Sequence, residues 1–307
     1  MILTSVIDAM EATPLVELSR IRDEIGYDGR ILAKLDYLLP GFSKKDRAAR
    51  YTIEAARASG VLAAGQTVVE LTSGNMGTGL AIVCGVLGHP FVAVMSEGNS
   101  PERARMMRAL GAEVVLVRQA SGARAGEVSG ADLALVEEAA QTLTRERGAF
   151  RADQFRMPAN TAAHQTGTAP EIWQQSGGSI TAFCDFVGSG GTLGGCARYF
   201  APKGVHCYAV EPDQAQHPIQ GGGYSMSELT HLKDVDLAGT ETVSGNEARK
   251  AARLLARREG VFGGYSAGAN LAAAIHLLQT REQGGTIAIV ICDSGLKYLS
   301  TDLWGTT

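Results

Sequence analysis

The sequence predicts an α/β protein with mostly parallel sheets and helices on both faces. Short apolar runs of strand length alternate with helical patterns along almost all of its 307 residues, which is typical of parallel strands joined by helices. The glycines at positions 60, 88 and 111 each follow an expected helix, where a left-handed backbone commonly ends one. A chain of this length can build a substantial core in one large unit or in two domains.

The expected elements follow from the spacing of apolar residues. Strands are expected at positions 31–35, 67–71, 91–95, 113–116, 182–187, 206–210 and 287–291. Helices are expected at 44–58, 77–86, 101–110, 131–147, 162–175, 193–200, 246–259 and 267–279. Functional groups should lie in the turns that follow strands, because open α/β sheets bind ligands there.

Charge and cysteine content exclude several classes of protein. Lys plus Arg number 28 and Asp plus Glu 32, so neither nucleic acid nor an anionic membrane is an expected partner. No stretch of about 18 apolar residues is present, and the first residues lack a secretion signal, so a cytoplasmic protein is expected. The five cysteines share no CxxC spacing, which argues for free thiols and against a metal or disulfide site.

Residues 72–77, Thr-Ser-Gly-Asn-Met-Gly, place hydroxyls, a carboxamide and flexible backbone in the turn between a strand and a helix. Backbone N–H groups at such a helix start can hold a carboxylate or a phosphate. Taken alone, a turn of this kind is more often only a helix cap. Its interpretation therefore depends on the segments that accompany it.

Residues 43–47, Ser-Lys-Lys-Asp-Arg, open the helix expected at 44–58, and Ser43 and Asp46 are spaced as in a capping box. A lysine in the first turn faces the positive end of the helix dipole, which disfavours its ammonium form. A neutral amine there can form a Schiff base. The alternative is a solvated, capped helix start with two surface lysines.

Two further turns are rich in glycine. Residues 188–192, Gly-Ser-Gly-Gly-Thr, can wrap N–H groups around an anion, but they match neither the dinucleotide fingerprint nor a Walker loop. Residues 264–268 have the Gly-x-Ser-x-Gly form of a hydrolase elbow. A hydrolase of that kind would need an acid and then a histidine downstream, whereas His276 precedes Asp293, which disfavours this interpretation.

In this order, the four segments resemble the fold-type II pyridoxal-phosphate enzymes, in particular the cysteine synthase (O-acetylserine sulfhydrylase) and cystathionine β-synthase family. The similarity runs from residues 12–16, Ala-Thr-Pro-Leu-Val, to residues 293–301. It implies a two-lobed fold like that of tryptophan synthase β and a homodimer. A smaller mobile lobe at 41–148 would carry the Schiff-base lysine and the substrate loop, and residues 1–40 with 149–307 would form a larger cofactor-binding lobe.

Carried over position by position, the resemblance makes Lys45 the catalytic lysine that binds pyridoxal 5′-phosphate, so that Lys44 should point elsewhere. It implies that Asn75 bonds the ring oxygen of the cofactor and that Ser266 faces the pyridine nitrogen. The phosphate should lie in the loop Gly188, Ser189, Gly190, Gly191 and Thr192. The substrate should be bound around Thr72, Ser73, Gly74, Met76 and Gln154.

The reaction that this resemblance implies is a β-replacement on an O-activated serine such as O-acetylserine. Lys45 would abstract the Cα proton, the β-substituent would leave to give an aminoacrylate, and a small nucleophile such as sulfide would add. A neutral hydroxyl at Ser266, where a carboxylate would hold the pyridine nitrogen protonated, favours elimination over transamination.

Several residues depart from the family pattern, mainly near the substrate. Met76 stands where threonine is usual, Leu39 where asparagine is usual, and Ser96 where proline is usual. Because Met76 replaces a hydroxyl by a flexible apolar chain, we hypothesise a donor or nucleophile that differs from those of plain cysteine synthesis. The alternative is drift within an ordinary cysteine synthase. A β-eliminating ammonia-lyase of the serine/threonine dehydratase kind and a non-catalytic regulatory relative are further alternatives.

Overall fold

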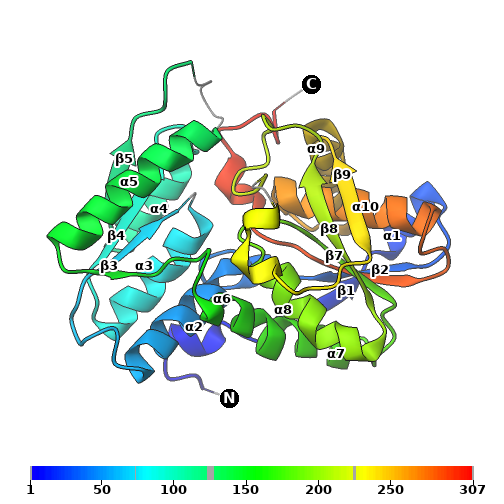
Figure 1. Ribbon diagram of the computed structural model, residues 1–307. Helices are drawn as coiled ribbons and strands as arrows, with labels where there is room; N and C mark the ends of the chain where they lie inside the picture. The colour runs from blue at the N-terminus through cyan, green and yellow to red at the C-terminus, as the bar shows by residue number, and fades with distance from the viewer. Residues whose placement is uncertain (1, 73, 123–127, 224–225, 306–307) are drawn as a thin grey trace.

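The computed structural model describes residues 2–72, 74–122, 128–223 and 226–305. These residues form one sheet of six strands and one of four. Every neighbouring pair of described strands is parallel except the first two of the larger sheet. In Figure 1 each sheet is accompanied by its own helices. The predicted α/β class with mostly parallel sheets is confirmed.

The larger sheet has the strand order β1 (Leu15–Glu17), β2 (Arg30–Lys34), β10 (Thr286–Val290), β7 (Ala182–Phe186), β8 (His206–Pro212) and β9 (Gly239–Val243). The helices on one face are α1 (Ser19–Ile25), α9 (Gly245–Leu254) and α10 (Tyr265–Gln279). On the other face lie α7 (Ala169–Gln175) and α8 (Gly191–Phe200). Because both faces are covered, β7 and β10 are buried along their whole length.

The smaller sheet has the strand order β5 (Glu113–Val117), β4 (Phe91–Ser96), β3 (Val68–Leu71) and β6 (Phe150–Arg151). One face packs against α3 (Asn75–Leu87), α4 (Pro101–Ala109) and α2 (Lys45–Ala58). The other face packs against α5 (Gly130–Glu146). Helix α2 contacts both α3 and α6 (Pro158–Ala163), so it links the two halves of Figure 1.

The structure differs from the sequence prediction at short or irregular elements. The expectation missed β1, β6, β9 and α1, which are short or lie at sheet edges and carry little apolar periodicity. The helix expected at 162–175 is divided into α6, a π-helical turn at His164–Thr168, and α7. Pro170 explains the division, because it has no N–H to donate to the preceding turn. In the described part of the chain, no helix is long and apolar enough to cross a bilayer.

The capping box expected at the start of α2 is wrong. Helix α2 begins at Lys45 and has no side-chain cap, and the Ser43 hydroxyl makes no hydrogen bond in the structure. The Asp46 carboxylate instead accepts the backbone N–H of Gly41. A Cβ at Gly41 would lie 2.3 Å from this carboxylate, so glycine is required for the loop to fold over Asp46.

A buried cluster of charges fixes α2 to the larger sheet. The guanidinium of Arg47, only 2% exposed, donates to both oxygens of Glu171 at 2.7 and 2.8 Å and to those of Asp36 at 3.1 and 3.2 Å. Lys34 lies 2.6 Å from the same Glu171 carboxylate, and the Thr13 hydroxyl donates to Asp36 at 2.6 Å. The end of β2 with the turn that follows it, helix α7 and helix α2 therefore meet at one network in which each charge has a partner of opposite sign.

Arg47→Met should lower the free energy of unfolding by about 3–5 kcal/mol, because it leaves the buried Asp36 carboxylate without its cation and Glu171 with Lys34 alone. Arg147→Met is the matched control, since Arg147 pairs with Glu113 at the surface and should contribute at most about 1 kcal/mol. Urea unfolding of both variants measures the difference. Equal losses would show that the buried network does not hold α2 in place.

Candidate active site

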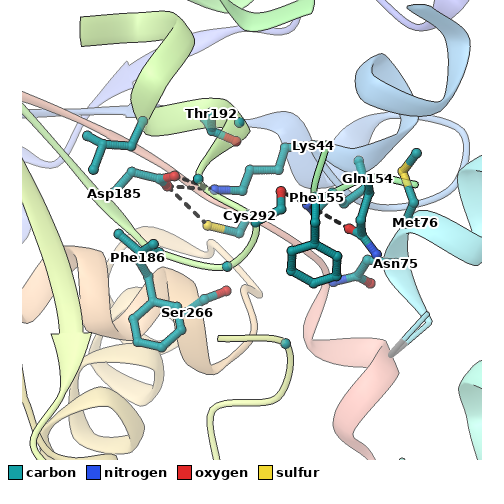
Figure 2. A pocket seen from close by; sticks show the side chains of 18 of the residues that line it. Lys44, Asn75, Met76, Gln154, Phe155, Asp185, Phe186, Thr192, Ser266 and Cys292 are labelled. Carbon is teal, nitrogen blue, oxygen red and sulfur yellow. Dashed lines mark hydrogen bonds and ion pairs between the residues drawn. The ribbon is translucent and has the colours of Figure 1, made fainter. Parts of the chain in front are cut away.

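Most of the predicted site residues meet in one cavity between the two sheets (Figure 2). Its walls come from the first turns of α2 and α3, the turn after β7, the start of α10 and the end of β10. The predicted residues that line it are Lys45, Asn75, Met76, Gln154, Gly188, Ser189, Gly190, Gly191, Thr192 and Ser266. Segments far apart in the sequence thus present an amine, amides, hydroxyls and helix N-termini to one space.

Lys45 is the first residue of α2 and extends into this cavity. Its Nζ donates to Gln154 Oε1 at 3.1 Å and to Ser189 Oγ at 3.0 Å, and both partners are uncharged. Burial, and next the positive charge of Lys44, lower the pKa of Lys45 to about 8. A lysine of this kind carries a substantial fraction of neutral amine near physiological pH and can attack a carbonyl carbon.

The turn after β7, which was predicted to hold an anion, lines the cavity with glycines and a helix N-terminus. Gly190, with a φ of +83°, directly precedes α8, so the first N–H groups of this helix face the cavity. A Cβ at Gly191 would lie 2.3 Å from Asn160 Oδ1, and one at Gly188 would lie 2.6 Å from Gly221 O. Asn160 Nδ2 in turn donates to Ser189 Oγ at 3.0 Å. The loop needs these glycines for close packing, and its helix N-terminus suits a phosphate.

The loop after β3 directs some of its backbone donors inward. Thr72 Oγ1 accepts the N–H groups of Gly74 and Gly77, each at 2.9 Å. Thr72 lines a smaller cavity that adjoins the central one and shares Gln220 with it. Binding a carboxylate on these two N–H groups would require the loop to rearrange. Ser73 lies outside the described residues.

Asn75 begins α3 and is held by the segment after β10. Its Nδ2 donates to Asp293 Oδ2 at 2.7 Å, and Lys297 Nζ donates to its Oδ1 at 2.8 Å. Lys297 also donates to Gly41 O at 2.7 Å. Since the Asn75 amide has two hydrogens, one remains to donate to a ligand oxygen. Sequence reasoning considered Asp293 only for the disfavoured hydrolase and gave Lys297 no role, although both lie in the segment that follows an expected buried strand.

Lys44 lines the same cavity, so the expectation that it points elsewhere is wrong. Its Nζ donates to both oxygens of Asp185 in β7, at 2.7 and 2.6 Å. Cys292 Sγ lies 3.7 Å from Asp185 Oδ1. Sequence reasoning missed this ion pair. An aspartate inside the apolar run 182–187 is the available signal, because a buried charge needs a partner.

Comparisons with known proteins agree with this geometry. A family described as "Pyridoxal-phosphate dependent enzyme" matches residues 6–293. A cysteine synthase of Staphylococcus aureus is 36% identical over 304 residues, covering 95% of this chain and 94% of the relative. An O-ureido-L-serine synthase structure has a TM-score of 0.87 and 33% identity, covering 99% of this chain and 96% of that one. An O-acetylserine-dependent cystathionine β-synthase from Helicobacter pylori has a TM-score of 0.90 and 30% identity, covering 99% and 100%.

Gly191→Ala should weaken the binding of pyridoxal phosphate at least about tenfold, which corresponds to about 1.4 kcal/mol. The reason is the 2.3 Å approach of the added Cβ to Asn160 Oδ1, which would displace either the loop or Asn160. Gly130→Ala is the control, because a Cβ at this first residue of α5 would meet no atom within 4 Å. Absorbance titration of the apoenzyme measures both dissociation constants. An unchanged value for Gly191→Ala would exclude this loop as the phosphate site.

Proposed function

Because this chain belongs to the pyridoxal-phosphate-dependent enzyme family and has cysteine synthases among its relatives, we propose that it replaces the β-substituent of an O-activated serine with a small nucleophile. It is a pyridoxal-phosphate-dependent β-substituting enzyme. The observation that carries the proposal is a buried lysine amine with a lowered pKa that shares one cavity with a cradle for a phosphate. A serine, and not a carboxylate, stands at the start of α10 in the same cavity.

The residues of the cavity fit pyridoxal phosphate. We assign the phosphate to the loop 188–192, the aldehyde carbon to Lys45 Nζ, the ring oxygen to Asn75 and the pyridine nitrogen to Ser266. When bound, the cofactor withdraws electrons from the substrate Cα, which acidifies the Cα proton and lets the β-substituent leave. Lys45 Nζ is the base that we assign to this proton, because it lies in the cavity and its lowered pKa suits proton transfer near neutral pH.

We assign the substrate carboxylate to the loop at Thr72, Ser73 and Gly74, with Gln154 and Met76 beside it. Gln154 is already oriented by two contacts, since its Oε1 accepts from Lys45 and its Nε2 donates to Leu71 O at 3.2 Å. Met76 is 2% exposed, lines the cavity and packs into the core of the smaller sheet. Its apolar chain supports the hypothesis of a donor or nucleophile with different polarity from that of plain cysteine synthesis.

The remaining expectations about assembly belong to the proposal. A smaller lobe at 41–148 would move against a larger lobe of 1–40 and 149–307, and the position of the cavity between the two sheets supports such a motion. The fourth strand of the smaller sheet, β6, follows directly beyond this boundary. We also propose a homodimer and a cytoplasmic location. The five cysteines are buried and free, as in proteins of reducing compartments.

The purified holoenzyme should convert at least one O-substituted L-serine, and a small nucleophile should then appear at Cβ of the product. The experiment mixes the enzyme with O-acetyl-, O-phospho- and other O-substituted serines and threonines, then adds sulfide, thiols or other nucleophiles, and identifies new amino acids by mass spectrometry. Lys45→Ala is the control and should form no product, because it lacks the assigned base. Release of keto acid and ammonia as the main products would favour the dehydratase alternative. No change with any donor would favour a non-catalytic relative.

Met76→Thr should change the ranking of donors or nucleophiles in the same assay, because it restores a hydroxyl and removes an apolar chain at the cavity wall. The measurement is kcat/KM for each pair of substrates. Ile82→Val is the control, since Ile82 lies in the same helix and the same core but not in the cavity wall. Unchanged values for every pair would mean that Met76 reflects drift within an ordinary cysteine synthase.

The rate at which apoenzyme takes up pyridoxal phosphate should rise with pH, with a midpoint near 8, and then level off. Only the neutral amine attacks the aldehyde, and this form dominates above the Lys45 pKa of about 8. Stopped-flow absorbance measures the rate, with Nα-acetyl-lysine as the reference amine, whose rate should keep rising to about pH 10. An enzyme rate that still increases about tenfold per pH unit between 9 and 10 would contradict a lowered pKa.

A further inference from the structure

One wall of the cavity holds an ion pair to which the proposed reaction assigns no role. Lys44 Nζ donates to the two oxygens of Asp185 at 2.7 and 2.6 Å, and the two residues are 8% and 2% exposed. The backbone N–H of Lys44 donates to Cys292 O at 2.9 Å, which ties the start of α2 to the end of β10. The pair is therefore buried and held by the backbone as well as by its own charges.

The contacts of this pair continue toward Ser266. Cys292 Sγ lies 3.7 Å from Asp185 Oδ1, and Ser266 lines the same cavity as this thiol. Figure 2 shows the thiol between the Asp185 carboxylate and the Ser266 hydroxyl. Asn270 Nδ2 also donates to Asp185 Oδ1, at 3.2 Å. A formal negative charge thus stands one side chain away from the serine that we assign to the pyridine nitrogen.

The charge beside the pyridine nitrogen decides how strongly the cofactor ring attracts electrons. A carboxylate near the pyridine nitrogen favours the protonated ring, which stabilises a carbanion strongly and opens transamination as a side reaction. A hydroxyl has no such effect. The Asp185 carboxylate would therefore undo the benefit of Ser266 if nothing cancelled its charge, and the ammonium of Lys44 lies on both of its oxygens.

We propose that Lys44 is a positioning residue that neutralises Asp185 and so leaves the Ser266 hydroxyl to set the protonation of the cofactor ring. This inference rests on the proposed placement of the ring. The same ammonium also acts on its neighbour in sequence, because burial first and Lys44 next lower the pKa of Lys45. The charge of Lys44 would then affect both the pKa of the reactive Lys45 amine and the protonation of the ring nitrogen.

The test uses the holoenzyme and L-alanine, which has no β-leaving group. In the half-reaction, the bond between the aldehyde carbon of the cofactor and Lys45 Nζ is broken, and so is the Cα–N bond of alanine. The amino group and the Cα hydrogen end on the aldehyde carbon, one water supplies the keto oxygen, and Lys45 is released as an amine. Alanine is oxidised to pyruvate while pyridoxal phosphate is reduced to pyridoxamine phosphate, in equal amounts. Chromatography of both products gives the rate.

Lys44→Met leaves Asp185 uncompensated and should raise this rate at least about tenfold, the effect of one pKa unit at the ring nitrogen. The visible spectrum of the bound cofactor, recorded without amino acid, should differ from wild type in this variant. Lys44→Arg keeps the charge and should match wild type in rate and spectrum. Lys44→Met with Asp185→Leu removes both charges together with their opposed effects on the pKa of Lys45, and it should not raise the rate. Asp185→Asn leaves the positive charge of Lys44 without its partner and should not raise the rate.

The proposal is overturned if Lys44→Met folds, binds the cofactor and keeps the wild-type rate and spectrum. It is also overturned if Asp185→Asn or the double variant raises the rate as much as Lys44→Met does. Disturbed packing of the cavity wall, and not the charge of Asp185, would then be the cause. Thermal unfolding of each apoenzyme reports folding. If Lys44→Met does not fold, Lys44→Gln, which keeps a hydrogen-bond donor beside Asp185 but no charge, takes its place with the same expected result and the same controls. The reaction with alanine involves no β-replacement. If the panel of O-substituted serines gave no product, the proposed function would fail, and the alanine experiment would still decide the role of Lys44.

Discussion

The arrangement of this enzyme depends on how the first turn of α2 buries its charges. Residues 44–47 are four consecutive charged side chains in the seam between the two sheets, where an unpaired ion is costly. Arg47 is paired with Asp36 beyond the end of β2, and Lys44 with Asp185 in β7. These partners belong to the larger sheet, so satisfying the charges also fixes the helix that carries Lys45. The ion pairs that neutralise the buried charges therefore also fix the position of the reactive amine.

Lys45 is the exception in this turn, because it is held by neutral oxygens. Gln154 and Ser189 accept from its amine, while the flanking cations have carboxylates. Burial and the neighbouring ammonium then lower its pKa to about 8. The chain thus leaves one amine reactive by pairing the cations on either side of it. Its position beside the phosphate cradle makes that reactivity useful to a cofactor that carries both an aldehyde and a phosphate.

Sequence reasoning found the site because its ligand-binding groups lie mostly in short turns. The loops at 72–77 and 188–192 each follow the pattern of strand, small residues and helix, and residues 264–268 place glycine and serine at a helix start. Such patterns are visible in neighbouring residues. It failed where another local feature overrides the expected spacing. The capping box at Ser43 does not form, because the Asp46 carboxylate binds the Gly41 N–H. The helix predicted at 162–175 also looked continuous, although Pro170 cannot continue the hydrogen-bond ladder.

By itself, the sequence determined the α/β class, the glycine-rich turns before helices, and a lysine at a helix start, since periodicity and turn chemistry depend on residues close together in the chain. Only the tertiary structure decided which partner each buried charge has. Asn75 meets Asp293 across 218 positions, and Lys44 meets Asp185 across 141. The free energy of a buried charge depends on the atoms within a few ångströms of it, and in this fold those atoms come from distant segments.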